Sequence, residues 1–198
     1  VDFVDDCMGE LLDGLEKHGL LDNTIVIYTS DHGEMLGLFG CWGKQLYHDP
    51  STQVPLLISG PGVAAGCSVD NPISLMDLFP TTCGLAGIPI PDGLDGVDFT
   101  PVLRSPNTAA APREFAPSAC YRYGVRINHN AFDENEPQTA WRSIRDARWK
   151  YAEVEQGQAL LFDLANDPNE TQNLAGTPEH ATRCRRMREK LYEQFSWD

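Results

Sequence analysis

The sequence contains no apolar run that approaches the ~18 residues needed to cross a bilayer. It also starts without an initiator Met, a basic leader segment or a cleavage signal, and Val1 already falls inside an amphipathic pattern. We therefore expect it to come from the interior of a longer protein. Its 198 residues, 41% of them hydrophobic, suffice for one substantial core or for a core with a small appended subdomain.

Basic side chains are scarce, with 15 Lys and Arg against 29 Asp and Glu, and the formal net charge is −14. Such a chain repels phosphate backbones and anionic membrane surfaces, so we expect no nucleic-acid partner and no membrane partner. An anionic substrate is still allowed, because a bound metal and a few local cations can reverse the field inside a pocket.

The six cysteines show no Cys-x-x-Cys spacing and no zinc-type cluster. This scatter favours free thiols in a reducing compartment over a disulfide framework, and hence a cytoplasmic over a periplasmic or secreted location. A secretion signal could still lie outside the sequence.

The first half has the pattern of an α/β unit. Apolar residues recur at helical spacing over residues 1–15, and Gly19 is a suitable stop. Residues 24–29 and 54–59 are short, non-alternating runs of the kind found in strands buried on both faces of mostly parallel sheets. The glycine-rich segment 30–50 between them predicts a long loop at the carboxyl end of the first strand, where open α/β sheets bind ligands.

The second half differs in pattern. Ser74 and Asp77 form a capping-box pattern that opens a short helix, with Pro80 near its first turn and Gly87 at its end. Later segments predict antiparallel strands over 139–155, with a turn near Asp146-Ala147, and over 158–164. Thr177 begins a final helix as its N-cap, with Pro178 as the first helical residue. We therefore predict the C-terminal half of an α/β core at 1–104, a Pro/Ala-rich connection at 105–117 and a small antiparallel β plus helix subdomain at 118–198.

Asp31 and His32 follow directly after the first predicted strand. A carboxylate is a hard oxygen ligand and an imidazole is a borderline nitrogen ligand, so adjacent residues of these types on a loop can hold one metal ion. By themselves they fit better with an Asp that caps a turn and a His that makes an ordinary hydrogen bond, and the metal role depends on the motifs around them.

Several short motifs follow one another along the sequence: Ser-Asp-His-Gly-Glu at 30–34, Trp-Gly-Lys at 42–44, Val-Pro-Leu at 54–56, Gly-Pro-Gly at 60–62, Trp-Lys-Tyr at 149–151, Leu-Phe-Asp-Leu at 161–164 and Asp-Pro-Asn-Glu at 167–170. In this order and spacing they resemble the sulfatase family within the alkaline phosphatase superfamily, closest to its choline-sulfatase and phosphonate monoester hydrolase members. The resemblance implies the C-terminal part of a mostly parallel sheet flanked by helices, followed by a small antiparallel subdomain.

The resemblance implies roles for individual residues. Asp31 and His32 would bind a divalent metal, usually calcium, with manganese as an alternative because His32 stands where many sulfatases have Asn. Lys44 would contact the sulfate oxygens and stabilise their charge in catalysis, although a solvated loop lysine is the simpler interpretation. His48 stands where the family often has an acidic residue, so it could face the substrate or be a structural histidine.

One expected motif is missing from the sequence. Sulfatases form their formylglycine nucleophile at a Cys-x-Pro/Ala-x-Arg motif, and here only Cys184 has an Arg four positions later, at Arg188, with the wrong residues between. The resemblance thus implies a formylglycine upstream, in an N-terminal half of the same protein that would be this chain's partner. This chain alone should be inactive.

These observations predict part of a sulfuric ester hydrolase that acts on a sulfate-ester small molecule or glycan and that could form a homo-oligomer. The alternative within the superfamily is a phosphonate monoester or phosphodiester hydrolase with a phosphonate-ester substrate. The alternative from another class is a non-catalytic fragment or binding subunit.

Overall fold

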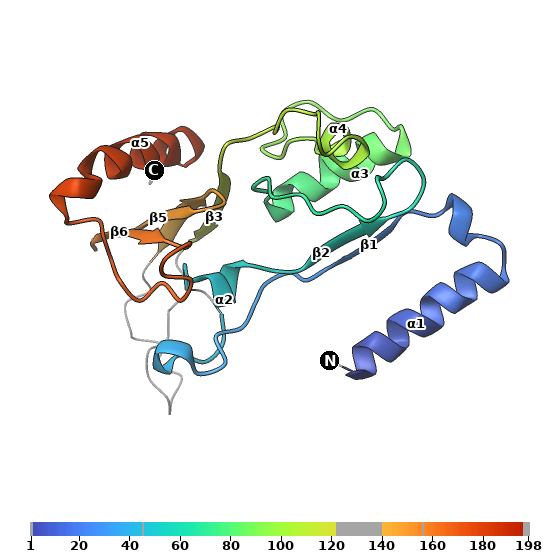
Figure 1. The fold of residues 1–198 in the computed structure, drawn as a ribbon, viewed down its shortest axis with the longest axis horizontal. Coiled ribbons are helices and arrows are strands. Elements are labelled where there is room, and N and C mark those ends of the chain that lie inside the picture. Colours follow the sequence, from blue (N-terminus) through green and yellow to red (C-terminus); the bar gives the residue numbers. More distant parts are fainter. Residues whose placement is uncertain (1, 45, 122–139, 156, 196–198) are drawn as a thin grey trace.

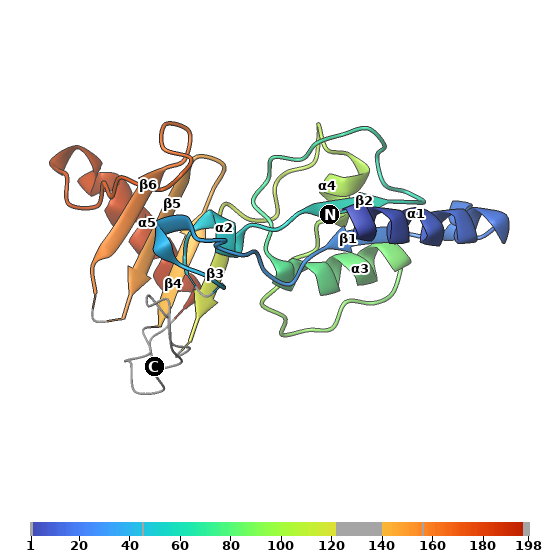
Figure 2. The same cartoon turned by 90° about the horizontal axis from the view of Figure 1, so that it is seen from below.

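The structure is a computed structural model that describes residues 2–44, 46–121, 140–155 and 157–195. It has an N-terminal lobe, residues 2–104, and a C-terminal lobe, residues 115–195, with the short helix α2 where the two meet (Figures 1 and 2). The N-terminal lobe holds α1 (Asp2–Lys17), η1 (Leu21–Asn23), β1 (Val26–Thr29), η2 (Leu38–Gly40), α2 (Asp49–Thr52), β2 (Leu56–Ser59), η3 (Leu75–Asp77), α3 (Leu78–Ala86) and α4 (Thr100–Arg104). The C-terminal lobe holds β3 (Ala116–Cys120), β4 (Trp141–Arg145), β5 (Trp149–Val154), β6 (Ala159–Asp163), η4 (Pro178–His180) and α5 (Ala181–Gln194).

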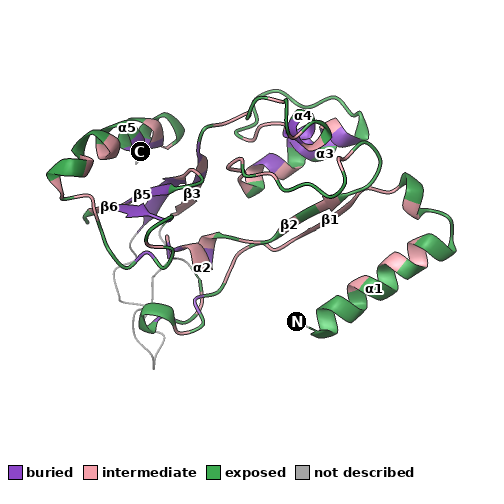
Figure 3. Cartoon of the chain, viewed as in Figure 1, coloured by how far each residue is buried: buried purple, intermediate pink, exposed green. Residues whose placement is uncertain are grey.

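The first predicted helix is confirmed as α1, and Gly19 ends it with a φ of 65°, a left-handed conformation that glycine adopts without strain. No residue of α1 is buried, and Val4 and Leu11 on its apolar stripe are 49% and 54% exposed. Figure 3 shows the helix without any buried position. None of the described helices is long and apolar enough to cross a bilayer.

The predicted parallel pairing is wrong for the strands that the structure describes. β1 and β2 form a two-stranded sheet and pair antiparallel, with Ile27 opposite Ile58. A parallel pair needs a crossover connection, usually a helix of its own, and the described residues between these strands form only the three-residue η2 and the four-residue α2. Neither strand contains a buried residue, so the expected burial on both faces is not found either.

The predicted capping box is confirmed at the start of η3, where the Ser74 N–H donates a 2.8 Å hydrogen bond to Oδ2 of Asp77. Pro80 lies in the first turn of α3, where its missing N–H costs no helical hydrogen bond. Gly87 closes α3 in the left-handed conformation.

The C-terminal lobe is a four-stranded antiparallel sheet in the order β3-β4-β5-β6, with α5 packed on one face (Figure 1). The predicted strands and their turn are confirmed, since the N–H of Asp146 donates to the carbonyl of Trp149 at 2.9 Å and closes the β4–β5 hairpin. The final helix begins, as predicted, with Thr177 as N-cap and Pro178 as first residue of η4. The core between sheet and helix consists of Phe115, Ile144, Trp149, Tyr151, Leu161, Met187 and Leu191.

Strand β3 was not predicted, because Pro117 lies within it and the segment has the composition of a linker. Proline removes a ladder hydrogen bond, but β3 is the edge strand of its sheet, where this is tolerated. The proposed connection at 105–117 therefore runs into the sheet; the domain boundaries themselves stay a prediction. All six cysteines are free thiols, as expected.

Candidate active site

Asp31 and His32 leave the end of β1 with their side chains facing each other. Nε2 of His32 lies 3.3 Å from Oδ2 of Asp31. Oδ1 of the same carboxylate accepts hydrogen bonds from the His32 N–H at 3.0 Å and from the Ser30 hydroxyl at 3.3 Å. The loop thus turns both candidate metal ligands to the same side.

Lys44 joins this pair from the far end of the loop. Its Nζ lies 2.5 Å from Nε2 of His32, although 12 residues separate the two in sequence. The sequence predicted that these three side chains would meet, and the structure brings them together.

The contacts of His32 orient its ring. Nδ1 lies 2.8 Å from the carbonyl oxygen of Gly33, which can only accept, so Nδ1 donates this bond. Nε2 faces the Lys44 ammonium at 2.5 Å and the Asp31 carboxylate at 3.3 Å. A histidine held at Nδ1 by a backbone carbonyl, with Nε2 turned to the proposed ligand position, is oriented as metal-binding histidines commonly are.

The Asp31 carboxylate is stabilised in its charged form. Desolvation opposes ionisation, but the nearby His32 and hydrogen bonds from backbone N–H groups and from Ser30 together lower the pKa of Asp31 below its usual value. Its side chain is 83% exposed, so the carboxylate is available to a ligand from solvent.

Close backbone contacts fix the loop directly after His32. The N–H of Gly33 donates to the carbonyl of Ser51 at 2.9 Å, and the N–H of Glu34 donates to the carbonyl of Pro50 at 2.8 Å. A Cβ on Gly33 would lie 1.9 Å from the Pro50 oxygen, so only glycine permits this approach.

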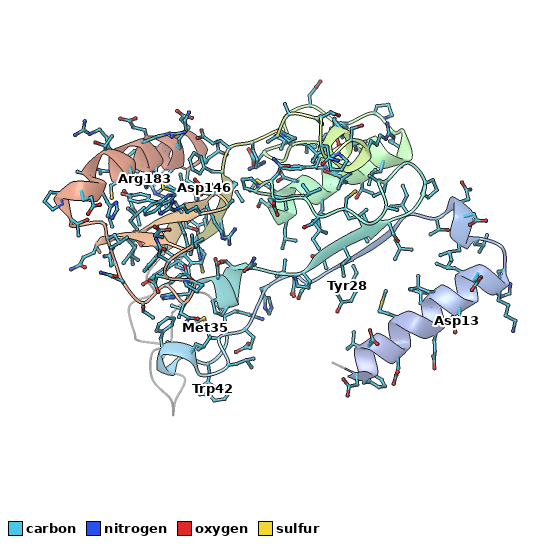
Figure 4. All side chains as sticks on the ribbon, viewed as in Figure 1. Asp13, Tyr28, Met35, Trp42, Asp146 and Arg183 are labelled. Atoms are coloured by element: carbon cyan, nitrogen blue, oxygen red, sulfur yellow. The ribbon has the colours of Figure 1, made fainter. Side chains whose placement is uncertain are left out.

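Glu34, to which the sequence assigned no role, holds the return of the loop. Its Oε1 accepts a 2.5 Å hydrogen bond from the N–H of Gly43, the residue before Lys44. The neighbouring Met35 is fully buried and packs with Cys41 and Leu46 beneath the loop. Trp42 is 67% exposed (Figure 4).

His48 lies among aromatic rings. It is 8% exposed, with its ring centroid 4.5 Å from that of Phe39, 4.4 Å from that of Tyr47 and 6.1 Å from that of Phe162. Burial, and next the charge of Lys150, lower the pKa of His48 to about 4. This is the environment of a neutral core histidine.

A cavity of about 1030 Å³ opens at the candidate site. Asp31, His32 and Lys44 line it from the N-terminal lobe, and residues of β3 and β4, including Ser143 and Arg145, line it from the C-terminal lobe. A ligand held at the Asp31–His32 pair would therefore lie between the two lobes.

The residues present fit part of a metal site. Among the residues that the structure describes, no three His, Cys, Asp or Glu side chains gather closely enough to hold a metal ion. Asp31 and His32 supply one carboxylate and one correctly oriented imidazole, whereas calcium takes ~6–8 oxygen ligands. The pair suits a divalent cation but needs further ligands.

A group of charges beside the loop was missed from the sequence, and its Asp49, Arg145 and Lys150 also line the cavity. Lys150 is 1% exposed and contacts Asp49 and Glu170, and Asp49 also contacts Arg145. The motifs that contain Lys150 and Glu170 were recognised in the sequence. They do not predict that these two side chains contact Asp49 of the loop. A lysine flanked by Trp149 and Tyr151 in a predicted strand was the available signal.

Sequence comparison relates the chain to one family of known proteins. The family profile described as Sulfatase matches residues 1–88. The choline-sulfatase of Rhizobium meliloti is 36% identical over 182 residues, which cover 90% of this chain and 32% of that protein. The chain belongs to the sulfatase family.

Two solved structures extend the match of this sulfatase chain to its fold. The phosphonate monoester hydrolase of Agrobacterium radiobacter superposes with a TM-score of 0.79 at 31% identity, covering 96% of this chain and 38% of that one. BT4656, solved with its substrate D-glucosamine-2-N,6-O-disulfate, superposes with a TM-score of 0.78 at 29% identity, covering 96% and 37%. The choline-sulfatase and phosphonate monoester hydrolase resemblance is thus confirmed.

The chain spans about a third of the length of the curated relatives it matches, and the match covers the C-terminal portion of its homologues. The activity and substrates of the whole protein are therefore proposals, taken up next.

Proposed function

We propose that the whole protein hydrolyses a sulfate ester and that this chain supplies the Asp31–His32–Lys44 part of its active site. The observation that carries the proposal is the convergence of these three side chains on one point, with Nε2 of His32 3.3 Å from Asp31 and 2.5 Å from Lys44.

Asp31 and His32 would hold a divalent cation, with calcium preferred and manganese as the alternative. When bound, such an ion acts as a Lewis acid toward the oxygens of the ester. The single lone pair of His32 Nε2 can serve the ion or Lys44, but not both. Binding of the ion would therefore release the Lys44 ammonium to the anionic substrate.

Lys44 would bind the nonbridging sulfate oxygens. Negative charge accumulates on these oxygens as the ester bond breaks, and a compact ammonium stabilises it. His48, buried among aromatic rings, would act on this site through packing rather than by touching the substrate.

The remaining parts of the reaction belong to protein outside this chain. A formylglycine nucleophile and further metal ligands would come from an N-terminal half, and the isolated chain would be inactive. The substrate class is a sulfate-ester small molecule or glycan, supported by the sulfated glucosamine bound to BT4656. Whether the assembly is a homo-oligomer is a separate expectation that the site does not depend on.

The second candidate is phosphonate monoester or phosphodiester hydrolysis. His32 and the superposition on the phosphonate monoester hydrolase favour it. The same cation site and lysine serve either chemistry, so the two differ in the substrate turned over. A non-catalytic binding subunit would turn over neither.

The test is made in the whole protein, with an aryl sulfate and an aryl phosphonate as substrates. Asp31→Ala should abolish turnover and weaken calcium binding measured by calorimetric titration. Lys44→Ala should lower kcat by about 10²–10³, the scale of one lost transition-state donor. Lys190→Ala, an exposed lysine paired with Glu193 on α5, is the matched control and should retain both.

Different results would reject different parts of the proposal. Normal turnover by Asp31→Ala would exclude the metal role, and a loss confined to KM would make Lys44 a uniform binding contact. Metal-dependent turnover by the 198-residue chain alone would show that the nucleophile lies within it.

A further inference from the structure

Lys150 is a charged residue at an unusual position. It lies on β5 with 1% of its side chain exposed, and its Nζ donates to Oδ1 of Asp49 at 2.6 Å and to Oε1 of Glu170 at 2.7 Å. An ammonium is rarely buried so fully unless it is paired, because taking it out of water is costly. Both of its partners lie far away in sequence, 101 and 20 residues from it.

The two carboxylates are themselves tied together. Oε2 of Glu170 accepts the N–H of Asp49 at 2.5 Å, and Oδ2 of Asp49 accepts from Arg145 at 3.2 Å. Glu170 adopts a φ of 54°, which is unusual for a residue other than glycine and persists only where its surroundings hold it. Helix α2, strand β5 and the turn after β6 therefore meet at Lys150.

Asp49 connects this cluster to the candidate site through two backbone hydrogen bonds. The residues that follow it, Pro50 and Ser51, offer the carbonyls that hold the N–H groups of Glu34 and Gly33 at 2.8 and 2.9 Å. Gly33 comes directly after His32 and fits against Pro50 with no room for a side chain. A displacement of Asp49 is thus passed to the residue next to the proposed metal ligand.

We propose that Lys150 is a positioning residue for the Asp31–His32–Lys44 site and acts on it through Asp49. The proposal rests on the function proposed above, because it explains how that site is held. A buried ion cluster gains little net stability over apolar residues of the same size, so its value lies in fixing one geometry. Active sites are sensitive to such geometry, since a misplacement of ~1 Å can cost about 100-fold in rate.

The test uses the whole protein and two variants of the cluster. Lys150→Met keeps the length of the side chain and removes its charge, and Glu170→Gln is an isosteric change that leaves the Lys150–Asp49 pair. We expect Lys150→Met to lower kcat about 10²-fold with KM changed less than about threefold, and to weaken calcium binding at least about tenfold. Glu170→Gln should also lower kcat and weaken calcium binding, each by a smaller factor.

Arg148→Met is the matched control. Arg148 lies next to β5 and forms a two-bond ion pair with Asp163, at 2.9 and 2.7 Å, that is separate from the Asp49 cluster. The Arg148→Met substitution should leave kcat and calcium affinity within about twofold of the parent protein. Hydrogen exchange without metal provides a third measurement: the amides of Gly33 and Glu34 should exchange faster in Lys150→Met but not in Arg148→Met.

The outcomes separate the two proposals. If Asp31→Ala loses calcium binding while Lys150→Met and Glu170→Gln keep both kcat and affinity, the positioning role is overturned and the site remains. If Asp31→Ala also keeps them, the proposed function itself fails. Should Lys150→Met not fold, Glu170→Gln decides alone, and parent-like kcat, calcium affinity and exchange in that variant would reject the positioning role.

Discussion

In the C-terminal lobe α5 buries Met187 and Leu191 against the sheet, whereas in the N-terminal lobe α1 buries no residue at all. Both helices are amphipathic, with an apolar stripe along one side. The stripe of α5 meets a four-stranded sheet with its own core, and the stripe of α1 stands beside a two-stranded sheet in which no residue is buried (Figure 3).

The difference separates the better packed part of the chain from the part that carries the proposed chemistry. Packing of an amphipathic face, rather than helix propensity, provides most helical stability in proteins. We expect the apolar face of α1 to be covered by the rest of the longer protein that we propose. Asp31 and His32 lie in the less buried lobe, and the loop that carries them also contacts the better packed lobe through Asp49 and the ring of His48.

The largest expected effect comes from the same substitution in the two helices. Leu191→Ala removes a fully buried side chain of α5 and should lower the free energy of unfolding by about 4 kcal/mol, through lost burial and the cavity left behind. Leu11→Ala, at a position that is 54% exposed on α1, should cost at most about 0.5 kcal/mol. Urea unfolding of the 198-residue chain measures both, and equal losses would mean that α1 is packed in solution.

Sequence periodicity located α1, α5 and the β4–β5 hairpin because their signals are local. A helical stripe, a cap at Ser74 and a turn at Asp146 each depend on residues a few positions apart. Whether β2 runs parallel or antiparallel to β1 depends instead on the path of the segment that connects them. A short apolar run does not determine that path. Strand β3 was missed because its segment has the composition of a linker. The sequence does not show that the segment lies at a sheet edge, where Pro117 is tolerated.

For the candidate site, the resemblance to a family named Asp31, His32 and Lys44, and the loop brings them together. The sequence could not provide what holds them. The contact of Lys150 with Asp49 joins residues 101 positions apart, and the fit of Gly33 against Pro50 is a backbone approach. Neither leaves a local pattern, so both had to come from the coordinates.

A smaller effect is expected at the contact between the lobes. The folded state holds the pKa of His48 at about 4, below its ordinary 6.5, mainly through burial against rings that include Phe162 of the C-terminal lobe. The folded state therefore binds fewer protons than the unfolded chain between these values. Stability from His48 is present above pH 6.5 and is lost as the pH falls through about 4, by about 3 kcal/mol in total.

His48→Phe removes this titration. The difference between the free energies of unfolding at pH 7 and pH 4 should therefore be about 3 kcal/mol smaller in the variant than in the parent. A titration of the His48 ring by NMR checks the cause directly. A ring that titrates near 6.5 would mean that the loop does not stay docked on the C-terminal lobe in solution.

The smallest effect should be confined to the C-terminal lobe. Arg148 donates two hydrogen bonds to Asp163, and this contact is the main reason that the pKa of Asp163 falls to about 2 from its ordinary 3.8. Because the folded pKa is lowered, the stabilisation is present above pH 3.8 and is lost as the pH falls through about 2. In Arg148→Met the pKa of Asp163 should rise toward 3.8, so acid unfolding should begin at higher pH. Only a modest loss of stability is expected near neutral pH, since Arg148 is 55% exposed and its charge is screened.

Hydrogen exchange shows whether this effect stays within the C-terminal lobe. In Arg148→Met, amide exchange in β4 and β5 should increase while exchange in β1 and β2 stays unchanged. An equal increase in both sheets would mean that the two lobes unfold as one unit.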